Sequence, residues 1–270
     1  MDLDALRRLR AFILDMDGVI YQGKAVLPGA AALIRALRGN GVPFRFLTNN
    51  STTPAAKVVA RLVDMGVPAL DGDVLTSAEV TAETLRQKHP GARVFVIGEE
   101  GVRQALAAAG LRAAADYTDT DLVVVGLDRT VTYAQLREAT LAIRRGAPFY
   151  ATNTDRALPT EVGWIPGAGS LVGALQIASD VDPIVIGKPS TAMFDYALGQ
   201  LNMPADATGA IGDRPETDIV GGQAAGVCTI AVLTGAGTAE AFAAMQRPPD
   251  FVFADLVAMG RAFFGSDFTG

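Results

Sequence analysis

The chain has 270 residues, half of them hydrophobic and 19% of them charged, with a formal net charge of −6. This composition supplies packed cores and excludes a wholly disordered chain, and the scattered basic residues argue against a nucleic-acid-binding protein. Cys228 and His89 are the single residues of their kinds, which excludes an internal disulfide and a zinc site of Cys and His ligands. No apolar run approaches the roughly 18 residues that cross a bilayer, so we expect a cytoplasmic protein that does not bind membranes.

Short apolar strands alternate with amphipathic helices along the chain. A buried strand is predicted at 11–14, followed by an alanine-rich helix from about Pro28 to Arg38. Thr53 and Pro54 predict the start of the next helix, since the hydroxyl can cap free amides and Pro loses nothing at the first helical position. Further strands are predicted at 44–47, 93–97, 122–125, 149–151, 184–186, 208–211, 228–232 and 251–253, and helices at 100–109, 133–145, 168–178, 191–201, 217–225 and 239–245. Such alternation is typical of parallel α/β sheets.

Four polar segments follow predicted strands. They are Asp15-Met16-Asp17-Gly18, Thr48-Asn49-Asn50-Ser51, Gly187-Lys188-Pro189, and Gly212-Asp213-Arg214 with Asp218 beyond. Ligands bind at the carboxyl ends of strands in open α/β sheets, so these segments are expected to converge on one crevice. Each segment alone has an ordinary explanation as a turn, a helix cap or a solvated loop. A calcium loop beginning at Asp15 is excluded, because Val19 and Val26 occupy positions that need oxygen ligands.

The order of these four segments resembles that of the motifs of phosphatases in the haloacid dehalogenase-like (HAD) superfamily. Within it the chain is similar to subfamily IIA, the NagD-like and para-nitrophenylphosphatase-like proteins, and the segments 28–30, 151–155 and 166–170 strengthen that match. The resemblance spans nearly the whole chain. It implies an α/β fold with a Rossmann-like, doubly wound parallel-sheet core and an inserted α/β cap of the C2 type. The catalytic core is then expected at residues 1–78 and 183–270, and the cap, which sets substrate specificity, at 79–182.

Two carboxyl groups in the first segment suit covalent and acid–base catalysis. Asp15 can attack phosphorus to form an aspartyl phosphate, and Asp17 can protonate the leaving oxygen and later activate water. The transferring phosphoryl oxygens need hydrogen-bond donors. The resemblance implies the Thr48 hydroxyl, the Asn49 backbone amide and the Lys188 ammonium as that set.

Crowding several aspartates together is unfavourable, because like charges resist mutual ionisation, and a divalent cation resolves the conflict. Ligation by oxygen atoms with retained waters suits Mg²⁺. The resemblance implies that the Asp15 carboxylate, the Asp17 backbone carbonyl and the Asp213 carboxylate are ligands. Asp218 is expected to act on the metal through water.

The resulting prediction is a Mg²⁺-dependent phosphatase that hydrolyses small phosphomonoesters, such as sugar, nucleotide or cofactor phosphates. Thr152, Asn153 and Asp155 follow a predicted cap strand and are candidates for choosing the leaving group, although a purely structural turn explains Asn153 and Asp155 equally well. A phosphomutase and a catalytically silent phosphate-binding module stay open as alternatives. A dehalogenase is disfavoured because it needs no general acid at Asp17. The expected partner is a small phosphorylated metabolite, and a homodimer formed through the caps is a further hypothesis.

Overall fold

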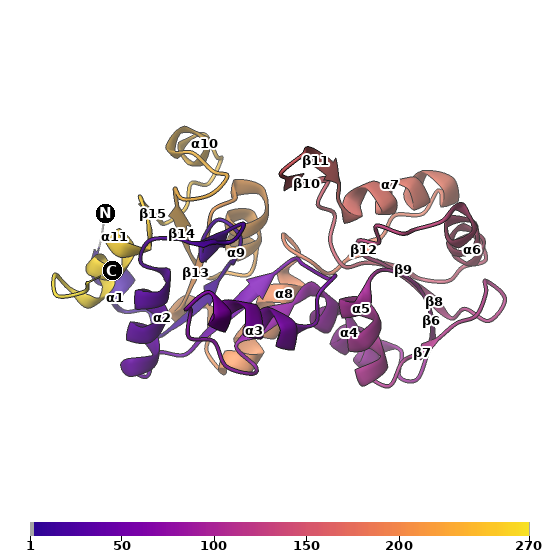
Figure 1. Ribbon diagram of the computed structural model, residues 1–270, viewed down its shortest axis with the longest axis horizontal. Helices are drawn as coiled ribbons and strands as arrows, with labels where there is room; N and C mark the ends of the chain where they lie inside the picture. Colours follow the sequence, from indigo (N-terminus) through magenta and orange to yellow (C-terminus); the bar gives the residue numbers. More distant parts are fainter. Residues whose placement is uncertain (1–2, 270) are drawn as a thin grey trace. The chain divides into compact units, whose positions relative to one another are not determined.

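The contacts of the computed structural model, which describes residues 3–269 apart from the side chain of Pro159, divide the chain into two compact units (Figure 1). The first unit contains the chain up to Thr48, Ala56–Leu75 and the chain from Lys188 onward. The second contains Asn49–Ala55 and Thr76–Gly187. The assignment of a catalytic role to one part and a specificity role to the other stays a prediction.

Among the described residues, the first unit is built on a six-stranded sheet in the order β15-β14-β13-β1-β4-β5. The pairings that join β15, β14, β13, β1 and β4 are parallel. The chain adds β4 and β5 on one side of β1 and later adds β13, β14 and β15 on the other, so β1 lies at the switch point of the topology. The strand bounds are β1 Ala11–Leu14, β4 Phe44–Thr48, β5 Val74–Thr76, β13 Thr208–Gly212, β14 Cys228–Val232 and β15 Phe251–Phe253.

Every residue of β1 and β13 is buried, as expected for central strands covered on both faces. Among the helices of this unit, α2 buries the apolar side chains Leu33, Ile34 and Leu37. The helical elements are α1 Leu3–Arg7, α2 Ala30–Gly39, α3 Ala55–Asp64, α8 Thr191–Leu201, η1 Ala205–Ala207, η2 Pro215–Ile219, α9 Val220–Ala224, α10 Ala239–Ala243 and α11 Leu256–Phe264. A small antiparallel hairpin, β2 Tyr21–Gln22 with β3 Ala25–Val26, follows β1.

The second unit, within the described residues, has its own five-stranded parallel sheet in the order β12-β9-β8-β6-β7. Helices α4 and α5 contact each other, as do α6 and α7, and the two pairs cover opposite faces of the sheet (Figure 1). The strands are β6 Arg93–Ile97, β7 Arg112–Ala113, β8 Leu122–Val125, β9 Phe149–Ala151 and β12 Ile184–Val185. The helices are α4 Ser77–Lys88, α5 Glu100–Ala108, α6 Tyr133–Arg144 and α7 Ala168–Ser179, and an antiparallel hairpin joins β10 Ala157–Thr160 to β11 Gly163–Pro166.

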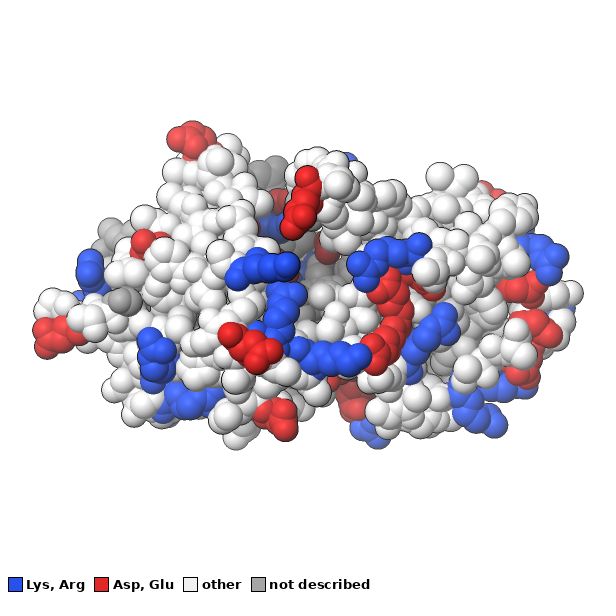
Figure 2. Space-filling model, viewed as in Figure 1, with Lys and Arg blue, Asp and Glu red and all other residues white. Residues whose placement is uncertain are grey.

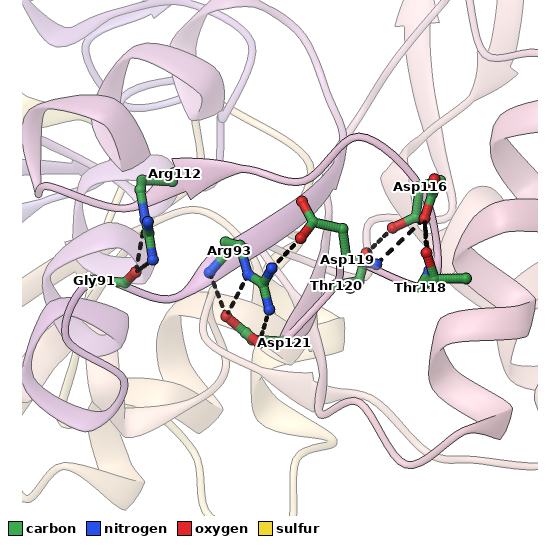
Figure 3. A network of polar contacts seen from close by, with 8 residues as sticks. All are labelled: Gly91, Arg93, Arg112, Asp116, Thr118, Asp119, Thr120 and Asp121. Atoms are coloured by element: carbon green, nitrogen blue, oxygen red, sulfur yellow. Dashed lines mark hydrogen bonds and ion pairs between the residues drawn. The ribbon is translucent and has the colours of Figure 1, made fainter.

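An exposed polar network holds the turn that leads into β8 (Figure 3). The Arg93 guanidinium forms ion pairs with Asp119 and Asp121, and the Arg93 backbone amide donates to Asp121 at 2.8 Å. Asp116 accepts hydrogen bonds from Thr118 within the same turn. Exposed ion pairs contribute little to stability, so we assign this network a local role in fixing the turn.

The described part of the chain has no helix that is both long and apolar enough to cross a membrane. Figure 2 shows basic and acidic side chains mixed across each unit on the viewed face. The fold is therefore a parallel α/β core unit interrupted by a second α/β unit, in agreement with the predicted fold class.

Candidate active site

Four predicted site residues of the first unit meet at the carboxyl ends of two paired strands. Asp15 directly follows β1, Asp213 directly follows β13, and Asp218 lies in the π-helix η2. Because β1 and β13 pair in parallel, their carboxyl ends are adjacent. Carboxylate oxygens of Asp15, Asp213 and Asp218 lie within 4.8 Å of one another. Lys188 reaches the same cluster from the segment before α8, and the structure thereby brings these four side chains together.

Lys188 is the buried positive charge of the cluster. Its Nζ donates to Asp15 Oδ1, to Asp218 Oδ1 at 2.7 Å and to the Leu47 carbonyl at 3.4 Å. Burial by itself lowers the pKa of the Lys188 ammonium, but the charges of Asp15 and Asp218 outweigh this effect and raise the pKa above its ordinary value. The ammonium therefore keeps its proton, as a buried charge with two carboxylate partners should.

A small cavity borders this ion-pair cluster. Asp15, Lys188 and Asp218 form part of its wall. Its remaining walls are the apolar residues Ile13, Leu47, Phe194, Ala210 and Ile211. Apolar walls of this kind lower the local polarity, so electrostatic interactions inside the cluster are stronger than they would be at the surface.

The carboxylates carry more negative charge than Lys188 alone can balance. Burial raises the pKa of Asp15 well above its ordinary value, Lys188 opposes the shift, and Asp218 and Asp213 add to it. Burial also raises the pKa of Asp213 to about 6, and the neighbouring Asp218 charge acts in the same direction. Mutual repulsion of this kind is the expected result of placing three carboxylates around one ammonium.

The chemistry of these donors fits a divalent metal ion. Asp213 Oδ1 is buried and has no hydrogen-bond partner among the described residues, whereas Asp213 Oδ2 accepts from the Ala236 amide at 2.6 Å. Asp218 Oδ2 accepts from the Asp213 and Arg214 amides, each at 3.1 Å. A buried carboxylate oxygen without a hydrogen bond calls for an explanation, and ligation of a hard cation provides one. The cluster is therefore a candidate metal site.

The loop after β14 packs closely against Asp213 at Gly235. Sequence analysis did not identify this contact. A Cβ atom at Gly235 would collide with the Asp213 carboxylate, and one at Gly18 would lie 2.5 Å from Asp213 Oδ2. Gly18 has a φ of +86°, and its carbonyl accepts a hydrogen bond from Thr234 Oγ1 at 2.6 Å. Only glycine fits such close approaches without strain. The Gly-Ala-Gly sequence at 235–237, directly beyond a predicted strand, was the available signal.

Asp17 differs from the buried carboxylates because it is exposed to solvent. The surrounding protein still removes enough water from its carboxyl group to raise the pKa, and this effect is opposed by a hydrogen bond from Tyr21 and by the charge of Arg61. Tyr21 Oη donates to Asp17 Oδ2 at 3.1 Å. Burial and the Asp17 charge both raise the pKa of Tyr21, so its hydroxyl stays protonated. Sequence analysis did not identify Tyr21.

Two of the three predicted phosphate donors, Thr48 and Asn49, lie at the end of β4, the strand beside β1. Thr48 is the last residue of β4 and is buried. Asn49 belongs to the second unit, where its Nδ2 donates to Asp155 Oδ1 at 3.3 Å and its carbonyl accepts from Asn153 Nδ2 at 2.8 Å. Thr48 thus belongs to the first unit, whereas Asn49 belongs to the second unit and bonds to two residues of the predicted cap.

The three predicted specificity residues have structural contacts inside the second unit. Thr152 Oγ1 donates to Ser51 Oγ at 3.0 Å, and the Asp155 amide donates to Asn153 Oδ1 at 3.1 Å. The second bond shapes the turn after β9, and the first, with the bonds that join Asn49 to Asn153 and Asp155, ties that turn to the segment 49–55. A structural role is therefore visible for each residue, and a role in choosing substrates stays a proposal.

Two family models match this chain. Residues 12–112 match the haloacid dehalogenase-like hydrolase family, and residues 185–259 match a HAD-hydrolase-like family. The chain belongs to the haloacid dehalogenase-like hydrolases.

Several members of that family are similar to this chain over most of its length. An acid sugar phosphatase from Staphylococcus epidermidis is 38% identical over 251 residues, which cover 93% of this chain and 96% of the relative. The 5'-nucleotidase YutF from Bacillus subtilis is 39% identical over 85% of this chain and 89% of its own length. The crystal structure of a 4-nitrophenylphosphatase from Thermotoga maritima superimposes with a TM-score of 0.90 at 35% identity, covering 96% of this chain and 99% of that one. A p-nitrophenyl phosphatase from Archaeoglobus fulgidus gives a TM-score of 0.89 at 34% identity, with 94% and 99% covered.

Proposed function

We propose that this protein is a Mg²⁺-dependent phosphatase that hydrolyses small phosphomonoesters through a covalent phosphoryl group on Asp15. Relatives described as an acid sugar phosphatase, a 5'-nucleotidase and p-nitrophenylphosphatases share this reaction class. The observation that carries the proposal is the cluster of Asp15, Lys188, Asp213 and Asp218 at the switch point of the core sheet. It combines a nucleophile, a fixed cation and oxygen donors for a metal in one place.

The first step transfers the phosphoryl group to the enzyme. A carboxylate oxygen of Asp15 forms a bond to phosphorus while the bond between phosphorus and the ester oxygen breaks. Asp17 gives its proton to the departing oxygen, so the product leaves as an alcohol. The Lys188 ammonium, the Thr48 hydroxyl and the Asn49 backbone amide are the proposed donors to the phosphoryl oxygens, which carry negative charge in the transition state.

The second step returns the enzyme to its starting state. The Asp17 carboxylate takes a proton from water, and the water oxygen forms a bond to phosphorus. The acyl phosphate bond to Asp15 breaks at the same time, which releases inorganic phosphate and restores the Asp15 carboxylate. Asp17 ends the cycle protonated, as it began.

Mg²⁺ is the proposed metal because the available donors are all oxygens. The Asp15 and Asp213 carboxylates and the Asp17 carbonyl would hold it, with Asp218 contributing through water. When bound, the cation would neutralise negative charge on the carboxylates and the phosphate. Asp213 Oδ1, which is buried and accepts no hydrogen bond from the residues that the structure describes, supports this assignment.

Substrate choice is assigned to the second unit, with Thr152, Asn153 and Asp155 as candidates. Changes at these residues should then alter the relative kcat/KM of different esters more than the chemistry of any one ester. A homodimer formed through the second unit is a separate hypothesis, and light scattering that gives the mass of a single chain would reject it.

Phosphate release from a broad panel of substrates tests the proposed function. The panel contains sugar phosphates, nucleoside monophosphates, cofactor phosphates and para-nitrophenyl phosphate, each assayed with Mg²⁺ and with EDTA. We expect turnover with Mg²⁺, a loss of at least about 10²-fold with EDTA, and recovery when Mg²⁺ is added back. Silence across the panel from folded protein that binds Mg²⁺ would contradict the proposal. Interconversion of sugar phosphate isomers without phosphate release would indicate a phosphomutase, and stoichiometric binding without turnover would indicate a binding module.

A further inference from the structure

Tyr21 lies at the beginning of the hairpin that follows Asp17, and the backbone folds back so that the two residues meet. The Gly18 amide donates to the Tyr21 carbonyl at 2.8 Å, and the Tyr21 amide donates to the Met16 carbonyl at 3.2 Å. A β-bridge pairs Asp17 with Tyr21. This tight turn carries the Tyr21 hydroxyl to the Asp17 carboxylate, where it donates to Oδ2 at 3.1 Å.

The Tyr21 ring is held firmly enough to act as a fixed donor. It is buried, with only 3% of the residue exposed. The Arg61 guanidinium, from α3, stacks over the ring at 4.3 Å from its centroid. Burial and this cation–π contact restrict the ring, so its hydroxyl is already in place before a substrate binds.

Asp17, by contrast, is an exposed residue, although the surrounding protein partly covers its carboxyl group. Tyr21 supplies the single side-chain hydrogen bond that the Asp17 carboxyl makes among the described residues, and this bond goes to Oδ2. Oδ1 therefore remains to carry the proton. Oδ2 acts as an acceptor whether Asp17 is protonated or ionised, so the bond can persist through both steps of the cycle.

We propose that Tyr21 is a positioning residue for Asp17: its hydroxyl fixes the carboxyl group so that Oδ1 can exchange a proton with the leaving oxygen and then with water. This inference rests on the proposed function, because it requires Asp17 to be the general acid and base. Tyr21 itself transfers no proton. Its contribution is orientation, which converts a freely rotating acid into an aligned one.

The test compares Tyr21→Phe with the unchanged enzyme on phenyl phosphate and para-nitrophenyl phosphate. The two esters have similar size, but phenolate is the poorer leaving group and depends more on protonation as it departs. The measured quantity is kcat/KM, which reports the steps up to departure of the leaving group and excludes the later hydrolysis of the intermediate. Tyr21→Phe removes the hydroxyl and keeps the stacked ring.

We expect kcat/KM for phenyl phosphate to fall by about 10- to 100-fold in Tyr21→Phe, since general acid catalysis contributes about 10²- to 10⁴-fold and only part depends on alignment. For para-nitrophenyl phosphate the fall in kcat/KM should stay below about threefold, because its leaving group needs little protonation as it departs. In an Asp17→Asn background, Tyr21→Phe should have no further effect on the ratio between the two esters, because the group that it aligns is no longer an acid.

Tyr150→Phe is the matched control. It removes another buried tyrosine hydroxyl, one that contacts His89 Nε2 at 2.9 Å in the second unit, and should leave the ratio between the two esters unchanged. Equal losses on both esters in Tyr21→Phe, or the same leaving-group effect in the Asp17→Asn background, would overturn the inference. Retained activity in Asp15→Asn would instead refute the proposed function, so the two failures are distinguishable.

Discussion

Asp15→Asn is expected to lower kcat for phosphate release by at least about 10⁴-fold while the protein stays folded. An amide cannot act as the nucleophile that accepts the phosphoryl group. The fold should tolerate the change because Asn has nearly the same shape and its carbonyl can still accept from Lys188. Removing one of three clustered carboxylates also relieves repulsion from Asp213 and Asp218.

The measurements for this variant are steady-state phosphate release and thermal unfolding followed by circular dichroism. Asp64→Asn, which removes an exposed carboxylate at the end of α3 in the same unit, is the control and should retain activity. Turnover by Asp15→Asn close to that of the unchanged enzyme would exclude Asp15 as the nucleophile. A large drop in the unfolding temperature would show that the loss arose from instability.

Lys188→Met is expected to cause both a large loss of stability and a loss of activity of about 10³-fold. Donors to the transition state contribute about 10²- to 10³-fold to the rate. The Lys188 ammonium also neutralises charge on Asp15 and Asp218. The buried ammonium balances two carboxylates, and Met leaves both without their cation. Removing one partner from a buried ion pair costs about 3–5 kcal/mol. Added Mg²⁺ should recover part of that stability by supplying positive charge to the same carboxylates.

Denaturant unfolding in EDTA and in excess Mg²⁺ checks this prediction. Lys24→Met, at an exposed position in the hairpin after β1, is the matched control and should change neither stability nor activity. If Lys188→Met unfolds at the same denaturant concentration as the unchanged protein, the ion-pair account of the core is wrong. A stability loss that Mg²⁺ does not reduce would argue against a metal site at these carboxylates.

The core strands were predictable because burial leaves a strong local signal. The apolar runs at 11–14, 208–211 and 228–232 are central strands in the structure, and the polar segments that follow the first two form the acidic cluster. The carboxyl ends of parallel strands lie at the same edge of a sheet, so motifs that follow such strands in the sequence are expected to lie close together in space. The pairing of β1 with β13 required the fold, because these strands are nearly 200 residues apart.

Several elements were missed where the sequence signal was short or polar. Helix α4 has a polar surface, but Thr76 and Glu79 form a capping box that was readable as a helix start. The start of helix α11 was indicated by Asp255, whose side chain accepts a hydrogen bond from the Ala258 amide and caps the helix. The predicted helix at 217–225 is helical in the structure, but it begins two residues earlier and its first part, η2 at Pro215–Ile219, is a π-helix that α9 continues to Ala224. The Asp218 side chain accepts from the Asp213 and Arg214 amides beside this element.

The least predictable part of the candidate site was the support around its reactive groups. The contact between Tyr21 and Asp17 forms across the turn at Gly18, which has a positive φ, and Arg61 of α3 lies over the Tyr21 ring. The closeness of Gly235 to Asp213 depends on how the loop after β14 returns to the sheet. Such contacts join segments that share no periodic pattern, so composition and spacing alone do not reveal them.

Trapping the phosphorylated enzyme tests the central claim most directly. The Asp17→Asn variant should accumulate the intermediate with para-nitrophenyl phosphate, because this leaving group needs little protonation whereas hydrolysis of the intermediate needs a base. Acid quenching during turnover, followed by peptide mapping with mass spectrometry, is predicted to find one phosphoryl group on Asp15. Treatment with hydroxylamine should remove this group, because it cleaves acyl phosphates. An active enzyme that yields no phosphorylated Asp15 under these conditions, or carries the phosphoryl group on another residue, would contradict the account.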